Sequence, residues 1–359
     1  MNLARPLILG IETSCDDTGC SVVDGTGRVL SSVVSSQLSV HRPFGGVVPE
    51  IASREHLSNW PAVSREALEA AHIAMWDIDA VAVTRGPGLV GCLLVGMSIG
   101  RAIAHGLGRR FHGVHHLEGH IYSPFLSARG EPAERAPERF HALVVSGGHT
   151  SLLEVERADV FSMVETRDDA FGEVFDKVGK RLGLPYPQGP KVDELAERGT
   201  ASKVMFRVPA VKQRQALYFS YSGLKSQALR EIQTLEHRGV LTGEAISYDR
   251  PDEIPQPVLD LLASFRYSAV RQLLDRLRRH QDRRSIRTLA VSGGAAANRL
   301  LRRELIRWAE EARVNLRLVP LVYSGDNAAM IAFAALMRGL YGKSDDPSHL
   351  QVASRIPFV

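Results

Sequence analysis

Alternating apolar runs and polar turns along the chain predict short strands that open two similar segments. In the first segment we expect strands at 7–11, 20–23 and 29–35, with a polar loop at 12–18 after the first strand. In the second segment the expected strands lie at 142–145, 151–155 and 161–165, with a loop at 146–150. Each segment therefore opens with a hairpin whose loop directly follows an apolar strand.

Both segments then run through helical sequence to a strand that ends in glycines before another helix. These strands are expected at 80–84 and 288–291, and the helices at about 90–105 and 296–312. A doubly wound dinucleotide fold would alternate single strands with helices, so the opening hairpins argue against it. The pattern instead predicts an α/β fold of the actin class, with two lobes of duplicated ribonuclease-H-like units around a central nucleotide cleft.

The lobes are expected at 1–125 and 140–359, joined by a linker at 126–139 that is rich in polar residues and proline. The second lobe carries an insert at about 185–257 with polar and proline-containing loops. Whether the last helices return to the first lobe is left open.

Composition places the chain among ordinary globular proteins, with 44% hydrophobic and 23% charged residues in 359. Three cysteines in no CxxC pair fit a reducing compartment, and the sequence lacks an uninterrupted run of about 18 apolar residues. We therefore expect a cytoplasmic protein without a membrane span.

The net charge of +4 permits a nucleic-acid partner without requiring one. Arginines cluster between 271 and 287, and this cluster fits either a solvated helix face or a stripe that contacts RNA.

Four loops place backbone N–H groups where they can bind anions, at 12–18, 146–150, 292–298 and 324–327. Two of them read Ser-Gly-Gly and are expected in corresponding halves of the fold. The GxxxxGK[ST] motif of P-loop enzymes is absent from the sequence.

His116 and His120 are four residues apart, so they share one face of a helix and can bind one metal ion. His112 and His116 have the same spacing. Asp326 is the best third ligand, although an Asp before the apolar stretch that follows also suits a helix N-cap. The HExxH pattern of zinc peptidases is absent from the sequence.

Motifs along nearly the entire chain resemble the tRNA threonylcarbamoyladenosine transferase family, formerly called O-sialoglycoprotein endopeptidases. They are GIETSCDDT from 10, GGVVPE from 45, GPGL from 86, HHLEGH from 115, VSGGHT from 145, GEVFDK from 172, YSGLK from 221, SGG from 292 and DN from 326.

The resemblance implies transfer of the threonylcarbamoyl group from threonylcarbamoyl-AMP to N6 of adenosine 37, in tRNAs that read codons beginning with A. It implies one divalent metal ion on His116, His120 and Asp326, with iron expected and zinc or magnesium as alternatives. The implied substrate contacts are Val144, Val145, Ser146, Gly147, Gly148, Asp176, Gly189, Asp193 and Asn298. The implied partners are tRNA, an actin-like paralogue and a P-loop ATPase.

One position departs from the family pattern, which has glycine where this chain has Gln188. If that position needs a positive φ, Gln188 would strain its loop. Asp16 or Asp17 would accept the N6 proton as the catalytic base, or one of them would only order its own loop. A metallopeptidase, a small-molecule kinase of the same fold and a non-enzymatic scaffold are the rival interpretations.

Overall fold

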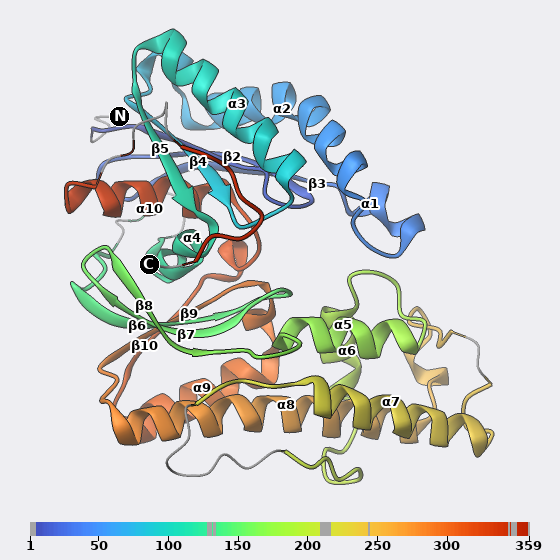
Figure 1. The fold of residues 1–359 in the computed structure, drawn as a ribbon. Helices are drawn as coiled ribbons and strands as arrows, with labels where there is room; N and C mark the ends of the chain where they lie inside the picture. The colour runs from blue at the N-terminus through green and yellow to red at the C-terminus, as the bar shows by residue number, and fades with distance from the viewer. Residues whose placement is uncertain are drawn as a thin grey trace. The chain divides into compact units, whose positions relative to one another are not determined.

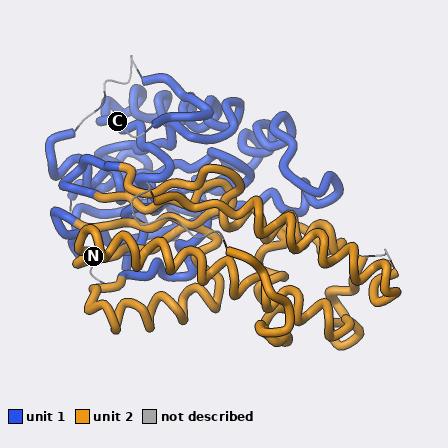
Figure 2. Tube along the Cα trace, turned by 60° about the horizontal axis from the view of Figure 1, so that its bottom comes forward, with its two compact units in different colours: residues 1–139, 155–161, 317–359 blue, residues 140–154, 162–316 orange. Residues whose placement is uncertain are grey.

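The computed structural model describes residues 5–127, 131, 134–208, 217–242, 245–343, 345 and 350–357, and the chain forms two compact units (Figure 2). Unit 1 comprises Met1–Arg139, Val155–Phe161 and Arg317–Val359, and unit 2 comprises Phe140–Glu154 and Ser162–Leu316. Residues 128–130 and 132–133 of the expected linker, and 209–216 and 243–244 of the expected insert, lie outside the described residues. The lobe limits given by the sequence stay a prediction.

A five-stranded mixed sheet forms the centre of unit 1 (Figure 1). Its strands are β1 (Ile8–Glu12), β2 (Asp17–Val23), β3 (Val29–Ser36), β4 (Ala80–Gly86) and β5 (Arg110–His115). The order is β3-β2-β1-β4-β5, with β1 antiparallel to β2 and parallel to β4, and β4 parallel to β5. The carboxyl ends of β1, β4 and β5 therefore meet at one edge of the sheet.

The helices of unit 1 are α1 (Leu38–His41), α2 (Pro49–Ala71), α3 (Val90–Leu107), α4 (His116–Tyr122) and α10 (Ala328–Leu340). Helices α2 and α3 cover one face of the sheet, and α10 packs against β1 and β2 on the other (Figure 1). Apolar strand residues such as Leu9, Ile11 and Val81 are fully buried between these layers. The last long helix of the chain thus belongs to unit 1.

Helix α3 is long and apolar enough, by length and composition, to cross a membrane. It packs against β4 and α2 within unit 1. A single helix of this kind is weak evidence for a span, because core helices of soluble proteins meet the same criterion.

The second sheet repeats the strand order of the first. Its strands are β6 (Arg139–Val145), β7 (Thr150–Glu156), β8 (Asp159–Glu165), β9 (Thr288–Ser292) and β10 (Asn315–Leu318). They lie in the order β10-β9-β6-β7-β8, which matches β5-β4-β1-β2-β3, and β6 is parallel to β9. The duplicated strand plan expected from the sequence is therefore confirmed.

Unit 2 carries the helices α5 (Phe171–Arg181), α6 (Gln188–Ala196), α7 (Ser222–His237), α8 (Gln256–Arg283) and α9 (Arg299–Ala312). The helix expected from about 296 begins instead at Arg299, because Asn298 accepts a hydrogen bond from Leu301 N and acts as the N-cap. The expected insert contains α6 and α7 in addition to loops.

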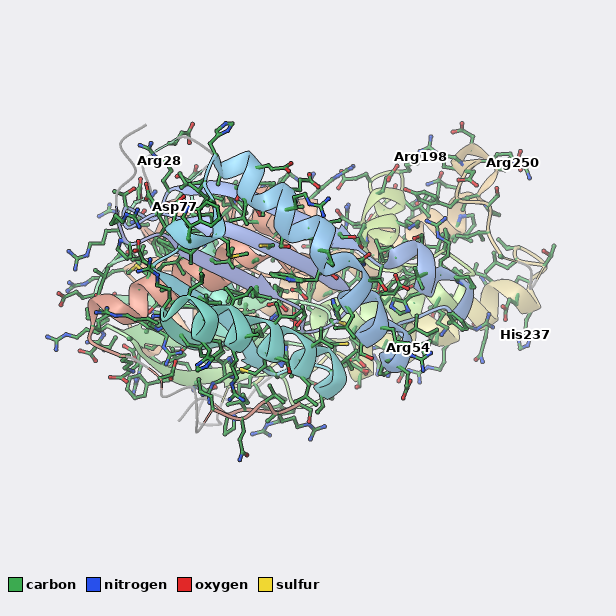
Figure 3. The ribbon with its side chains drawn as sticks, turned by 90° about the horizontal axis from the view of Figure 1, so that it is seen from above. Arg28, Arg54, Asp77, Arg198, His237 and Arg250 are labelled. Atoms are coloured by element: carbon green, nitrogen blue, oxygen red, sulfur yellow. The ribbon has the colours of Figure 1, made fainter. Side chains whose placement is uncertain are left out.

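Charged side chains cover much of the exposed surface, among them Arg54 of unit 1 and Arg198 and Arg250 of unit 2 (Figure 3). The arginine cluster at 271–287 is not one uniform stripe. Arg276 is 1% exposed and donates to Tyr218 O, and Arg279 pairs with Asp275. Both interpretations of the exposed members stay open.

Candidate metal centre and anion-binding loops

The candidate metal ligands converge at the edge of the unit 1 sheet where β1, β4 and β5 end. Strand β5 ends at His115, and α4 begins with His116 and carries His120 one turn later. Asp326 lies in the loop just before α10. A Cβ at Gly10 of β1 would collide with the carbonyl oxygen of Ala328, so only glycine lets α10 begin this close to the strand. The close approach of α10 to β1 places Asp326, just before α10, beside His116 and His120.

The three side chains point at one another. Asp326 Oδ1 lies 3.4 Å from His116 Nε2 and 3.2 Å from His120 Nε2. One ligand atom from each residue lies within 4.8 Å of the others. Nitrogen and oxygen ligands about 2.1 Å from a shared ion lie roughly 3.0–3.5 Å apart when they are adjacent, so the two ion-pair distances suit a common ion.

Glu12, the last residue of β1, supports His116 from behind. Its Oε2 lies 3.2 Å from His116 Nδ1 and accepts a hydrogen bond of 2.6 Å from Thr84 Oγ1. Its Oε1 accepts from Ser14 N at 2.5 Å. A carboxylate on one ring nitrogen orients a histidine so that the other nitrogen can bind metal. The sequence prediction missed Glu12, although it follows a buried strand in a loop singled out for anion binding.

The charges of this cluster favour a cation. Burial opposes the charge of His116, but Asp326 and Glu12 raise its pKa well above the usual value. Burial likewise opposes ionisation of Asp326, yet His116 and His120 hold its pKa well below the usual range. Two carboxylates thus keep a positive charge on a buried imidazole, and a dication can replace that proton.

The donor set fits a transition metal. Two imidazoles and one carboxylate that leave further positions open are the set of non-haem iron sites, and similar sets bind zinc. Magnesium prefers oxygen ligands, so the two imidazoles suit it poorly. His120 Nδ1 is buried and has no hydrogen-bond partner among the described residues.

Two alternatives left open by the sequence are decided by geometry. The N-cap of α10 is Asn327, whose side chain accepts from Met330 N, so Asp326 is not the cap. His112 lies on β5, so it does not share a helix face with His116.

Asp16 ends the loop between β1 and β2, and Asp17 is the first residue of β2, where it pairs with Ser36 of β3. Asp17 Oδ1 is buried without a hydrogen-bond partner among the described residues. Burial raises the pKa of Asp17 to about 7. A hydrogen bond with Ser36 lowers this pKa, and the negative charge of Asp16 raises it further. A carboxyl group that titrates near neutral pH can serve as a general base.

All nine predicted substrate contacts belong to unit 2. Val144 and Val145 are buried at the end of β6, whereas Gly147 and Gly148 are exposed in the loop that follows. Contrary to the expectation of corresponding halves, both Ser-Gly-Gly loops follow strands of one sheet, because Val144 pairs with Ser292 of β9. Gly293 has φ +93°, and a Cβ at this position would collide with Val145 O, so only glycine fits where the two loops meet.

The other predicted contacts are linked to this loop through helix starts. Gly172 N of α5 donates to Ser146 O at 3.2 Å, and Gly189 N of α6 donates to Asp176 Oδ1 at 2.7 Å. Burial raises the pKa of Asp176 despite the amides of Gly189 and Gln188. Asp176 therefore accepts from the first turn of α6 and holds Gly189 beside it.

The carboxylate of Asp193 binds other groups of the protein. Its Oδ1 lies 3.0 Å from Arg266 NH1, and its Oδ2 accepts from Arg299 N at 3.0 Å. Because Asn298 is the residue before Arg299, this bond brings α6 to the start of α9 and places Asp193 near Asn298.

Gln188 does not strain its loop. It is the first residue of α6, its backbone is outside the positive-φ region, and its buried amide donates to Leu184 O at 3.4 Å.

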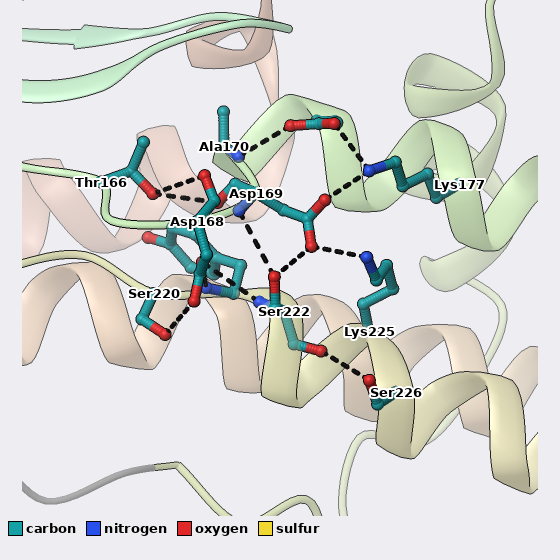
Figure 4. Close-up of polar contacts among 11 residues, drawn as sticks. Thr166, Asp168, Asp169, Ala170, Lys177, Ser220, Ser222, Lys225 and Ser226 are labelled. Atoms are coloured by element: carbon teal, nitrogen blue, oxygen red, sulfur yellow. Dashed lines mark hydrogen bonds and ion pairs between the residues drawn. The ribbon is translucent and has the colours of Figure 1, made fainter.

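Lys225, the last residue of the YSGLK motif, belongs to a polar network around Asp169 (Figure 4). Asp169 binds Lys225 at 2.6 Å and also pairs with Lys177 of α5. Asp168 accepts from Tyr221 N at 2.7 Å, which ties the start of α7 to the same loop. The lysines of two motifs thus hold α5 and α7 together through one carboxylate.

The fold and these sites define an actin-like α/β protein with a candidate His-His-Asp metal centre and amide-rich loops. Residues 28–333 match the family model of tRNA N6-adenosine threonylcarbamoyltransferase. The chain therefore belongs to the tRNA N6-adenosine threonylcarbamoyltransferase family, a family of tRNA-modifying transferases, and the resemblance drawn from its motifs is confirmed.

Relatives with this name cover nearly all of the chain. The chain is 40% identical to the protein of Clostridium perfringens over 346 residues, which is 96% of each chain. It is 39% identical to that of Thermosipho africanus over 341 residues, 95% of this chain and 96% of the relative. It is 41% identical to that of a Picosynechococcus species over 360 aligned positions, 98% and 95% of the two chains.

Solved structures of HypF share the fold. Full-length HypF aligns with a TM-score of 0.59 at 12% identity and covers 95% of this chain and 56% of its own. HypF of T. kodakarensis aligns with a TM-score of 0.56 at 14% identity, over 95% of this chain and 48% of its own. These similarities confirm the predicted actin-like fold class and, at such low identity, say nothing further about activity.

Proposed function

We propose that the chain transfers the threonylcarbamoyl group of threonylcarbamoyl-AMP to N6 of adenosine 37 in tRNAs that read codons beginning with A. The convergence of His116, His120 and Asp326 in a chain of this family carries the proposal. The metal is proposed to be iron(II), with zinc the next candidate, and it would polarise oxygens of the adenylate when bound.

In the proposed reaction the adenosine N6 attacks the carbamoyl carbon. A C–N bond forms, the C–O bond to the phosphate breaks, and AMP leaves. Asp17, with its pKa near 7, takes the N6 proton. The exposed amides of Gly147 and Gly148 hold phosphate, and Asp176 and Asn298 bind the ribose or adenine. N6 is a weak nucleophile, so positioning and charge stabilisation must supply most of the rate.

The proposed partners follow from the same assignment. They are tRNA, an actin-like paralogue and a small P-loop ATPase in the cytoplasm, with a separate synthase that makes the adenylate. Adenosine 37 lies in the anticodon loop, and its base must leave the stack to reach a protein site, as bases of single-stranded RNA loops do.

The test is single-turnover transfer from synthetic threonylcarbamoyl-AMP to unmodified tRNA, with iron(II) and the partner proteins present. Wild type should form the modified nucleoside, and His116→Ala/His120→Ala should lose at least about 100-fold in rate, as metal-assisted catalysis predicts. Absence of product with wild type would refute the transferase proposal. Full activity of the double variant would leave the transfer in place and refute the metal's part in it.

A further inference from the structure

A series of buried polar side chains contacts the turn that leads from β1 to Asp16 and into β2 at Asp17. It consists of Gln37, which is the N-cap of α1, His41 at the end of α1 and His56 in α2, and each is at most 1% exposed. Buried polar groups of this kind destabilise the fold unless they are hydrogen-bonded, so their bonds show what they hold in place.

The bonds of His56 fix its protonation. Its Nε2 lies 3.1 Å from Cys15 O, and a carbonyl oxygen only accepts, so Nε2 carries the proton. Nδ1 then accepts from Thr18 Oγ1 at 2.7 Å and from Gln37 Nε2 at 3.3 Å. Burial lowers the pKa of His56, which favours this neutral tautomer.

The same logic extends to His41. Gln37 Nε2 also donates to Ala52 O at 3.3 Å, so Gln37 Oε1 is the acceptor for His41 Nε2 at 3.1 Å. His41 Nδ1 accepts from Val48 N at 3.4 Å. The hydrogen bonds therefore all point the same way: each group donates to the next, from Val48 N through His41, Gln37 and His56 to Cys15 O.

This series of hydrogen bonds ends on the backbone carbonyl groups of Cys15 and Asp16. His56 holds Cys15 O, and Gln37 N donates to Asp16 O at 2.9 Å. The two consecutive peptide planes on either side of Asp16 are thus fixed, and together with the pairing of Asp17 to Ser36 in the sheet they set where the Asp17 side chain points.

We propose that His56 and Gln37 are positioning residues that aim the carboxylate of Asp17 for proton transfer. The inference rests on the proposed function of Asp17 but concerns residues to which the family motifs gave no role. His56 does not touch the substrate in this proposal and acts only through Cys15 O.

A matched pair of variants tests the bond to Cys15 O. In His56→Gln the amide nitrogen reaches the Nε2 position and donates to Cys15 O, whereas in His56→Asn the amide ends at the Nδ1 position and cannot. We expect His56→Gln to keep the single-turnover rate within about threefold, and His56→Asn to lose at least about 30-fold with the KM for the adenylate unchanged, as loss of orientation predicts. Equal rates in both variants, or equal losses that follow their melting temperatures, would overturn the proposal.

Two spectroscopic measurements test the positioning role of His56 without an activity assay. Imidazole ¹⁵N shifts of the wild type should show Nε2–H tautomers for His41 and His56, and an Nδ1–H tautomer at His56 would overturn the proposal even if neither variant folds. The ¹³C titration of the Asp17 carboxyl should shift by at least about 0.5 pH unit in His56→Asn and not in His56→Gln. If wild type transfers nothing, the proposed function falls, and these titrations still support or overturn the positioning.

Discussion

Two carboxylates of the GIETSCDDT motif, the buried Glu12 and the partly buried Asp17, behave in opposite ways because their neighbours differ. Burial opposes ionisation of both groups. At Glu12 the positive charge and hydrogen bond of His116 prevail and lower the pKa, whereas at Asp17 burial prevails and raises the pKa to about 7. Environment thus fits Glu12 to orient a metal ligand and Asp17 to exchange a proton.

Substitution of Glu12→Gln should weaken metal binding. The amide keeps the shape of the side chain but removes the negative charge at His116 Nδ1, and loss of such a supporting carboxylate typically lowers metal affinity by about 10–100-fold. Zinc titration against a chromophoric chelator measures the change. Glu50→Gln, at the exposed start of α2, is the control and should bind zinc as wild type does. Unchanged affinity in Glu12→Gln would contradict the assigned role.

Asp17→Asn should change how stability depends on pH. The pKa of Asp17 in the folded chain, about 7, lies above the ordinary value of 3.8. Its protonation therefore contributes stability that is full below about pH 3.8 and is lost as the pH rises from there through about 7. An asparagine stays neutral throughout, so the variant should gain stability relative to wild type across this window, by at most about 4 kcal/mol.

Urea unfolding of both proteins at pH 4.5, 6 and 8 measures this difference. A flat difference for Asp17→Asn would show that its carboxyl group is ionised at all three values.

At the scale of elements, single contacts decide how helices dock. Helix α10 approaches β1 because residue 10 has no side chain, and α7 joins α5 because Asp169 accepts from lysines of both. Burial opposes ionisation of Asp169, but hydrogen bonds from Lys177, Lys225 and Ser222 lower its pKa. The YSGLK motif is thus explained by helix docking within unit 2.

Lys225→Met should therefore destabilise the protein. It keeps the apolar stem of the side chain but leaves the carboxylate of Asp169, 7% exposed, with one fewer charged partner. We expect the free energy of unfolding to fall by about 1–3 kcal/mol. Lys180→Met, on the exposed side of α5, should change it by less than about 0.5 kcal/mol. Equal effects of the two substitutions in urea unfolding would argue against the network.

At the scale of the whole molecule, the two sites belong to different compact units. All three candidate metal ligands are in unit 1, and all nine predicted substrate contacts are in unit 2. Metal binding stabilises the part of the chain that supplies the ligands, so the two units should respond differently to it.

Adding zinc to chelator-treated protein should slow hydrogen exchange in α4 and in residues 324–330, by about tenfold or more at saturation. Peptides from α5 and α9 in unit 2 should exchange as before. His120→Ala should abolish the effect in unit 1. Slower exchange in unit 2 alone would place the metal on other residues.

The sequence by itself determined the strand plan, the class of fold and the family, because these depend on local periodicity and on motifs that are contiguous in the chain. It predicted that His116 and His120 share one face, since four residues make about one turn of an α-helix. It could not show that Asn327 rather than Asp326 caps α10, or that both Ser-Gly-Gly loops lie on one sheet. The placement of the two loops follows from pairing between distant segments, whereas the cap depends on which of two adjacent polar residues adopts the N-cap backbone conformation. Likewise, Glu12 meets His116 and His56 meets Cys15 only after β1, β5 and α2 are packed, because burial and long-range contacts, which local sequence does not encode, decide which polar groups become partners.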